Sequence, residues 1–460
     1  MVKKMNGKFA AGLMMATALT FATPSKAQSL FEALSQTYNT NPTLQSQRAY
    51  LRSVDENVAI AKSGYRPSIA LTGGYNDRNS NVDNSSSFSQ AGGDSTTTTL
   101  AAKISQPIFS GFATVNSVKS ADSLVRAEQN NLATVEQNIF LSASTAYMDV
   151  LQNAAIVDLQ KNNEKLLKKR LDETIQRFNV GEVTRTDVSQ ARARHSQAVS
   201  DRIASEGTYE ASKAIYIQLI GTQPEKLEEP EAIKDFLPKT YDEAYEIAVT
   251  NNYSIQAAKN LLKSQSYDVY TNTGALLPQV SLDGSVSKVK TEYDNNLLGD
   301  TTSDNVEWGV NMTIPLYNSG ESRAKIRQSK YKKWQAQEQV IEAERQVKSV
   351  VSSAWEYMIA NQSKIKAIQE QVNANQVALD GVQKEEALGN RTILDVLDAY
   401  QELLNSNVNE VKARRDYYVS GMNLLMSMGK LTAKDLKLGV DIYNPKKFYK
   451  ETRDKWLSLN

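Results

Sequence analysis

Two short stretches of this chain share one pattern, and that pattern decides how the chain folds. Residues 178–188 read FNVGEVTRTDV, and residues 386–396 read EALGNRTILDV. In each stretch a glycine is followed three residues later by Thr, and that Thr is followed three residues later by Asp. Glycine adopts the left-handed conformation that ends a helix, and Thr-x-x-Asp is a capping box that begins the next helix. The pattern therefore predicts two helical hairpins, with tips at 181–186 and 389–392.

The stretch before each tip predicts a very long helix. Residues 115–180 contain no proline, and a helix of this length spans roughly 100 Å. A coiled-coil seam recurs in it every seven residues, at Val118, Val125, Leu132, Ile139 and Ala146. A second such helix is expected at about 322–388, with small and polar residues at many seam positions. Small seam residues pack closely but shallowly, which favours a ring of helices around water over a solid bundle.

The similarity of the two tips extends over most of the chain. Residues 31–34 correspond to 242–245 at a shift of 211 residues, whereas Pro107-Ile-Phe corresponds to Pro315-Leu-Tyr at a shift of 208. The three missing residues fall in a loop rich in Gly, Ser, Asn and Asp, and such length variation is typical of an exposed hairpin tip. The chain is therefore expected to contain one structural unit in two copies.

Each copy also contains a pair of amphipathic segments, at about 68–108 and about 279–316, which predict β-hairpins. Apolar residues alternate with polar residues or glycine, most clearly in the stretch VEWGVNMTI at 306–314. One face of such a strand suits lipid and the other suits water. Four strands cannot close a barrel, for which about eight is the usual minimum, so strands that span a membrane must be shared between chains. The alternative is a hairpin packed on a soluble core, but the chain has little other apolar surface to cover it.

The chain begins like an exported protein. Lys3, Lys4 and Lys8 precede an apolar run at 9–22, and small residues follow at the spacing of a signal-peptide cleavage site. No later apolar stretch is long enough for a membrane helix. The expected organisation is a signal peptide at 1–27, a first repeat at 28–225, a linker at 226–239, a second repeat at 240–432 and a C-terminal tail at 433–460.

Composition excludes several classes of site. The chain has no cysteine, which excludes disulfides, thiolate metal sites and cysteine nucleophiles. Its single histidine, His195, lies among Arg192, Arg194 and Gln197 on a polar segment, where a solvated side chain is expected. Removal of the signal changes the net charge from +1 to −3. This balance lacks the excess of basic residues that is typical of a nucleic-acid-binding protein. No phosphate-binding loop or nucleophile motif occurs either, so we expect neither an enzyme nor a cofactor.

Two carboxylates in the second tip need separate explanations. Asp395 is the capping residue, with Arg391 just ahead of it. Asp398 lies one turn beyond the cap, and its counterpart in the first copy is Gln190. A like-charge pair three residues apart costs a few tenths of a kcal/mol, and two carboxylates make a weak site for a divalent cation. Capping does not explain Asp398.

These features together resemble the TolC-like outer membrane efflux proteins, also called outer membrane factors. The resemblance covers nearly the whole mature chain. It rests on the signal, the duplication, the second tip at 389–398, and the strand exits Pro107-Ile-Phe-Ser-Gly111 and Pro315-Leu-Tyr-Asn-Ser-Gly320. The segments Tyr443-Asn-Pro445 and Lys455-Trp456 also resemble the tails of the family's non-lipidated members.

The resemblance implies an α+β membrane protein that works as a homotrimer. Four strands per chain would join in a shared 12-stranded transmembrane β-barrel in outer-membrane lipid, continued by a long periplasmic α-helical barrel. The channel would be the passive exit duct of a tripartite efflux pump or a type I secretion system of a Gram-negative bacterium. Its implied partners are a periplasmic adaptor protein and an inner-membrane efflux transporter or ABC exporter. Nothing in the sequence selects drugs or proteins as the cargo.

The resemblance also assigns roles to residues of the tips. In a close group of the family, an arginine and neighbouring acids hold the periplasmic entrance shut, and Glu386 stands where those relatives carry a tyrosine. The implied roles are a pore constriction at Asp395 and Asp398, a gate network of Arg391, Thr186, Asp187 and Glu386, and adaptor-contacting tips at Val180, Gly181, Leu388 and Gly389. The alternative function is a secreted periplasmic coiled-coil scaffold without a channel, which leaves the alternating strands unexplained.

Overall fold

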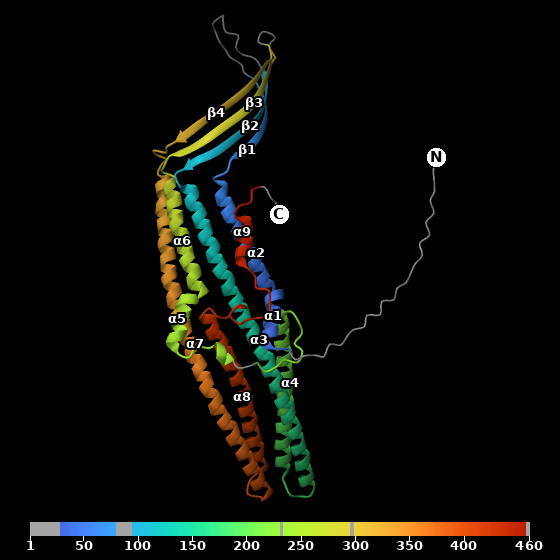
Figure 1. Ribbon diagram of the computed structural model, residues 1–460. Helices are drawn as coiled ribbons and strands as arrows, with labels where there is room; N and C mark the ends of the chain where they lie inside the picture. The colour runs from blue at the N-terminus through green and yellow to red at the C-terminus, as the bar shows by residue number, and fades with distance from the viewer. Residues whose placement is uncertain (1–27, 80–93, 231–232, 295–298, 457–460) are drawn as a thin grey trace, which may run out of the picture.

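A computed structural model describes residues 28–79, 94–230, 233–294 and 299–456. The predicted signal peptide and the loop within each β-hairpin lie largely outside the described residues. The described part is long and narrow, with four strands at one end and two helical hairpin tips at the other (Figure 1). Strands and helices are thus segregated along the axis, as in an α+β fold.

Two short helices open each half of the chain. In the first half α1 covers Leu30–Thr40 and α2 covers Pro42–Ser63; in the second, α5 covers Tyr241–Asn251 and α6 covers Tyr253–Gly274. These bounds are related by the shift of 211 residues that the sequence predicts. The residue before α2, Asn41, caps that helix by accepting from the N–H groups of the second and third residues after it, and Asn252 does the same for α6. The duplication is therefore present in the local hydrogen bonding as well as in the sequence.

A long helix and its return partner complete each half. Helix α3 covers Ala113–Asn179 and α7 covers Glu321–Ala387, each 67 residues long, and the return helices are α4 at Arg185–Ile220 and α8 at Ile393–Ser427. The predicted long helices and their tips are confirmed. Four of the five predicted seam residues of α3 are buried, and Val118 is half-buried. Among the described residues, no helix is both long and apolar enough to cross a membrane.

The four strands form one antiparallel sheet in chain order. Strand β1 covers Ser68–Arg78, β2 covers Ser95–Ser110, β3 covers Gln279–Tyr293 and β4 covers Thr301–Thr313. The two hairpins join where β2 pairs with β3, which places Gly284 opposite Ile104. A Cβ on Gly284 would lie 3.1 Å from Ile104, so this glycine gives room to the larger side chain. Strands β1 and β4 are the two edges of the sheet within the chain.

The sheet leaves its apolar face uncovered. Leu71 is 74% exposed and Trp308 is 80% exposed, and the other alternating apolar residues of β4 are also exposed. The opposite face is polar, with Asp283 accepting from Ser105 at 2.5 Å and from Asn311 at 2.6 Å. The sheet extends beyond the helices (Figure 1). The alternative of a hairpin packed on a soluble core is therefore wrong for the described strands.

A pair of residues with left-handed backbone turns each hairpin into its long helix. The first pair is Gly111 and Phe112, with φ of 62° and 63°, and the second is Ser319 and Gly320, with φ of 54° and 84°. At Gly111 there is no room for a side chain, because a Cβ would lie 2.3 Å from the carbonyl oxygen of Gly274. This close approach locks the end of α6 against the start of α3.

The main core lies halfway along the long helices, where the short helices surround them. Its largest buried side chains include Phe140 and Tyr147 of α3 and Tyr216 of α4. The Tyr147 hydroxyl lies 2.7 Å from the carbonyl oxygens of both Gln28 and Glu228, which ties the start of the described chain to the predicted linker. This core fastens both halves together around their middle.

The segments outside the repeats pack on this framework. The predicted linker contains a short 3-10 helix, η1, at Ile233–Phe236. After α8, the chain contributes Leu431 and Leu436 to the core and ends in helix α9, Pro445–Thr452, which packs against α2 (Figure 1). Helix α9 was not predicted from the sequence. The predicted limits of the linker and tail remain predictions.

Candidate functional site

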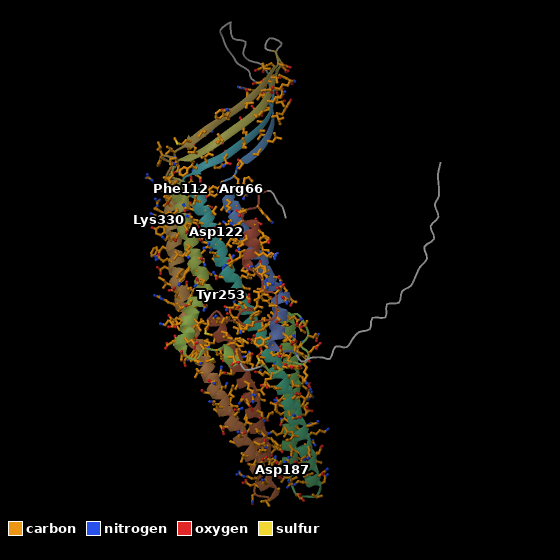
Figure 2. All side chains as sticks on the ribbon, viewed as in Figure 1. Arg66, Phe112, Asp122, Asp187, Tyr253 and Lys330 are labelled. Carbon is orange, nitrogen blue, oxygen red and sulfur yellow. The ribbon has the colours of Figure 1, made fainter. Side chains whose placement is uncertain are left out.

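The two hairpin tips have the same local structure. In each, the glycine has left-handed backbone, with φ of 81° in the first tip and 77° in the second. Thr184 and Asp187 exchange two hydrogen bonds: the Asp187 carboxylate accepts from the Thr184 N–H at 2.8 Å, and the Thr184 hydroxyl accepts from the Asp187 N–H at 3.2 Å. Thr392 and Asp395 repeat both bonds at the same distances. Both predicted capping boxes are confirmed. Asp187 is labelled in Figure 2 and lies at the end of the molecule away from the strands.

Capping also sets the charge of Asp395. The backbone N–H and the hydroxyl of Thr392 donate to its carboxylate and hold the pKa of Asp395 below its usual range. The nearby Arg391 guanidinium acts in the same direction. These donors therefore favour the negatively charged form of Asp395 at the tip.

Asp398 pairs with the other hairpin. Arg194 of α4 donates to its carboxylate at 2.5 Å, and both side chains are partly exposed to solvent. The family resemblance implies a place for Asp398 in the pore constriction, but no sequence pattern assigned a role to Arg194, which lies in a polar segment. The available signal was the comparison of the two copies, because Arg194 corresponds to Glu402 and Asp398 to Gln190, so charge differs between copies at both positions.

A second ion pair joins the hairpins closer to the tips. Arg177 of α3 donates to Glu386 of α7 at 2.5 Å and to Glu182 of its own tip at 3.2 Å. The hydrogen bond from Arg177 to Glu386 raises the pKa of the arginine further above its usual range. Only 12% of the Glu386 side chain is exposed, so this pair is better shielded from water than the Arg194 pair.

Within one chain, Arg391 pairs with an acid of its own hairpin. The family resemblance implies a network of Arg391 with the acids Asp187 and Glu386, and within the described part of the chain Arg391 donates to Glu385 at 2.9 Å. The reason is local: Arg391 follows the left-handed turn and folds back onto the last turn of α7, where Glu385 lies. Glu386 faces α3 and is already held by Arg177.

A third contact between hairpins lies above the ion pairs. The hydroxyl of Tyr400 on α8 accepts from Arg170 of α3 at 3.3 Å and lies 2.6 Å from the amide nitrogen of Gln383 on α7. Next to it, Leu167, Ala198 and Leu397 form a small buried apolar cluster. The hairpins are thus joined by two ion pairs, a hydrogen-bonded tyrosine and a small apolar cluster.

The turns themselves are exposed. Val180 and Leu388, which directly precede Gly181 and Gly389, expose most of their side chains, and Thr186 is also exposed. Two exposed apolar residues at equivalent places form a candidate contact surface. No cluster of three or more acidic or histidine side chains suited to a metal ion occurs in the described ranges.

A family model supplies an independent comparison. The model of outer membrane efflux proteins matches residues 33–222 and again residues 244–430. The two matches coincide with the two copies of the repeated unit. They also exclude the N-terminal and C-terminal segments that lie outside the repeats.

Individual relatives and a solved structure agree with this match. The outer membrane efflux protein BepC of Brucella suis is 37% identical over 450 residues, which cover 98% of this chain and 96% of BepC. The outer membrane protein TolC of Escherichia coli is 25% identical over 433 residues, covering 90% of this chain and 85% of TolC. The Campylobacter jejuni CmeC outer membrane channel superposes with a TM-score of 0.76 at 15% identity and 98% coverage of each chain, which shows the same fold.

Proposed function

This chain belongs to the outer membrane efflux protein family, and from this premise we propose that three copies assemble into one channel. The channel lies in the outer membrane of a Gram-negative bacterium and extends into the periplasm. It is the exit duct of a tripartite efflux pump or a type I secretion system. We expect the duct to be passive and to catalyse no reaction, with energy supplied by an inner-membrane transporter.

One observation carries the proposed assembly: the sheet has an uncovered apolar face and two unpaired edges within the chain. An unpaired edge in lipid leaves backbone N–H and C=O groups without partners, at a cost of several kcal/mol for each group. Pairing β1 of one copy with β4 of the next removes every edge at once. Three copies give twelve strands, above the usual minimum of about eight for a closed barrel.

The long helices support the same assembly. Helix α7 exposes Tyr331, Trp334 and Tyr357, which are large apolar side chains without a covering element in the described chain. Aromatic residues of this kind are enriched where proteins meet. In the proposed trimer this side of α7 contacts a neighbouring copy, and the helices close into a barrel in the periplasm.

The tips are then the periplasmic entrance. The proposed constriction consists of Asp395 and Asp398, as the family resemblance implies. The proposed gate network keeps Arg391, Thr186, Asp187 and Glu386, and the ion pairs of the chain add Arg177, Arg194 and Glu385. The exposed turns at Val180, Gly181, Leu388 and Gly389 are the proposed contact for a periplasmic adaptor, through which an efflux transporter or ABC exporter connects.

Cysteine crosslinking tests the assembly, because the chain contains no cysteine of its own. Thr72→Cys on the polar face of β1 is combined in turn with a cysteine at 305, 307, 309 or 311 on the polar face of β4. One register should give a ladder of linked chains in outer membranes that ends at the trimer. Absence of crosslinks in every register, together with recovery of the protein in the soluble periplasm, would favour the scaffold function instead.

A further inference from the structure

A large pocket with many charged side chains in its wall lies between the strands and the tips, away from both. It is a cavity of about 710 Å³ between α2, α3, the start of α6 and the C-terminal segment. Asp122 and Tyr253, which both line it, lie between the strands and the tips (Figure 2). Its volume is in the range of about 300 to 1,000 Å³ that is usual for ligand sites. Neither the channel nor the gate uses it.

An arginine with unused donors lies in the wall of this pocket. The Arg48 guanidinium stacks on the rings of Tyr38 and Tyr443, 4.4 Å and 5.1 Å from their centres. Its Nε and Nη2 atoms are buried and have no acceptor among the described residues, and the buried hydroxyl of Tyr443 also has no partner there. Buried donors without acceptors cost free energy, so the site is arranged for an acceptor from outside the chain.

The pocket is strongly positive. Two acids line it, and both are engaged by the protein: Asp122 accepts from the Tyr449 hydroxyl at 2.5 Å, and Glu136 accepts from the Ala433 N–H at 2.7 Å. Burial also raises the pKa of Glu136, which weakens its negative charge. Six cationic side chains line the same space: Arg48, Arg126, Lys434, Lys446, Lys450 and Arg453. A concave site with such an excess of one sign concentrates anions.

The remaining lining suits a polar body attached to the anion. Amide side chains of Gln129, Asn130 and Asn260 line the cavity with Tyr253. Amides and phenols hydrogen-bond to hydroxyl groups, and the cavity is much larger than one phosphate or carboxylate group. We propose that this pocket binds a small anionic sugar, whose phosphate or carboxylate accepts from Arg48 and lies among the lysines of α9.

The proposed ligand would join separate parts of the chain. Arg48 belongs to α2, Gln129 to α3 and Lys446 to α9, and the covalent link between α9 and the repeats is the chain that follows α8. A ligand held by all three therefore fastens the C-terminal segment to the helices. We expect bound ligand to slow proteolysis of this segment.

Calorimetric titration of the full-length protein in detergent tests the proposal. The probes are N-acetylglucosamine 1-phosphate for the phosphate group, glucuronate for the carboxylate group and neutral N-acetylglucosamine as a control. At least one of the two acids should bind saturably, and its affinity should fall with added salt. The neutral sugar should not bind. The acid that binds more tightly identifies the anionic group. Equal binding of the neutral sugar, or no binding of either acid at millimolar concentration, would overturn the proposal.

Three variants locate the binding. Arg48→Gln and Lys446→Gln should each weaken the acid by about tenfold, the expected loss for one hydrogen bond to a charged group. Lys447→Gln is the matched control, because this exposed neighbour in α9 loses the same charge but does not line the pocket. If Arg48→Gln does not fold, the comparison of Lys446→Gln with Lys447→Gln still tests whether the ligand binds in this pocket. Equal weakening by both lysine variants would contradict the site. Binding is measured without conduction, so the result is independent of the proposed channel.

Discussion

Arg194 of the first helical hairpin donates to Asp398 of the second at 2.5 Å, so an acid of the proposed constriction is already paired within its own chain. Both side chains are partly exposed, and exposed pairs contribute only about 0.2 to 1 kcal/mol. The pair therefore matters more for the charge of the entrance than for stability. Asp395, whose carboxylate accepts from its capping partner, forms no ion pair within the described ranges, although Arg391 lies near it.

Removal of Asp398 and removal of Arg194 should change the ion selectivity of the channel in opposite directions. Asp398→Asn removes an acid from the proposed pore, and we expect a weaker preference for potassium over chloride. Arg194→Gln leaves Asp398 without its cation, and we expect a stronger preference and stronger block by multivalent cations from the periplasmic side. Reversal potentials in planar bilayers measure both effects.

The matched control for this prediction is Arg192→Gln. Arg192 is an exposed arginine on the same helix and loses the same charge. Trimer yield should be normal in all three variants. If Asp398→Asn and Arg194→Gln leave selectivity and block unchanged, Asp398 does not face the pore.

The closed entrance should depend on Arg177 more than on Arg391. Arg177→Ser leaves the largely buried Glu386 without its cation, and we expect a loss of about 1 kcal/mol, since the arginine itself is 42% exposed. Arg391 and Glu385 are both half-exposed, so Arg391→Ser should open the entrance less. Single-channel conductance shows which of the two variants opens the entrance more. A larger conductance in Arg391→Ser than in Arg177→Ser would reverse the assignment.

Local signals in the sequence account for the elements of this fold. Gly181 and Gly389 end the long helices, and the Thr-x-x-Asp boxes begin their partners, so the hairpins were predictable to within about two residues. Alternation of apolar and polar residues located the strands because apolar side chains of neighbouring strands, such as Leu71, Val286 and Val306, lie on one face of the sheet. These features depend on residues close together in the chain, and a pattern can reveal them.

The ion pairs at the tips could not be predicted in the same way. Arg177 and Glu386 are 209 residues apart, and Arg194 and Asp398 are 204 apart. Their pairing depends on how one hairpin lies against the other, which no local pattern contains. The pocket around Arg48 was missed for the same reason, because one of its walls comes from α9 at the far end of the chain.

A charge on the exposed face of β4 should weaken assembly. Val310→Arg places a cation where the proposed barrel meets lipid, at a cost of about 2 to 4 kcal/mol near mid-membrane. Asn311→Arg is the matched control, since it puts the same side chain at the same depth but on the polar face, beside Asp283. Heat-modifiable migration of outer-membrane extracts measures the trimer. Equal trimer yield in both variants would show that Val310 does not face lipid.

A side chain at Gly111 should disrupt the junction of sheet and helices. Its Cβ would overlap the Gly274 carbonyl at 2.3 Å, and its φ of 62° is strained for any other residue. We expect Gly111→Ala to lower the yield of folded protein sharply. Gly73→Ala in β1, where a Cβ meets nothing within 4 Å, is the control. Comparable folding of both variants would mean that α6 can move away from this junction.

The last prediction concerns Asp55, a fully buried carboxyl of α2 without a hydrogen-bond partner among the described residues. Burial, assisted by the charge of Glu56, raises the pKa of Asp55 from 3.8 to about 7. Because the folded pKa is higher than the unfolded one, the folded state binds the additional proton between these values. The contribution of Asp55 to stability is therefore most favourable below pH about 4 and becomes less favourable as the pH rises toward about 7, where the effect saturates.

Asp55→Asn removes this dependence with little change in shape. The variant should melt at a higher temperature than the wild type at pH about 8, where the wild type must bury a charge, and the difference should nearly vanish at pH about 4. One pKa unit corresponds to about 1.36 kcal/mol, so the gain in the free energy of unfolding at high pH is a few kcal/mol at most. Asp77→Asn, an exposed acid of β1, is the control and should shift melting little at either pH. Melting is followed by circular dichroism of the protein in detergent. A constant difference between Asp55→Asn and wild type across this range would show that Asp55 does not titrate there, and that any stabilisation comes from packing of the amide.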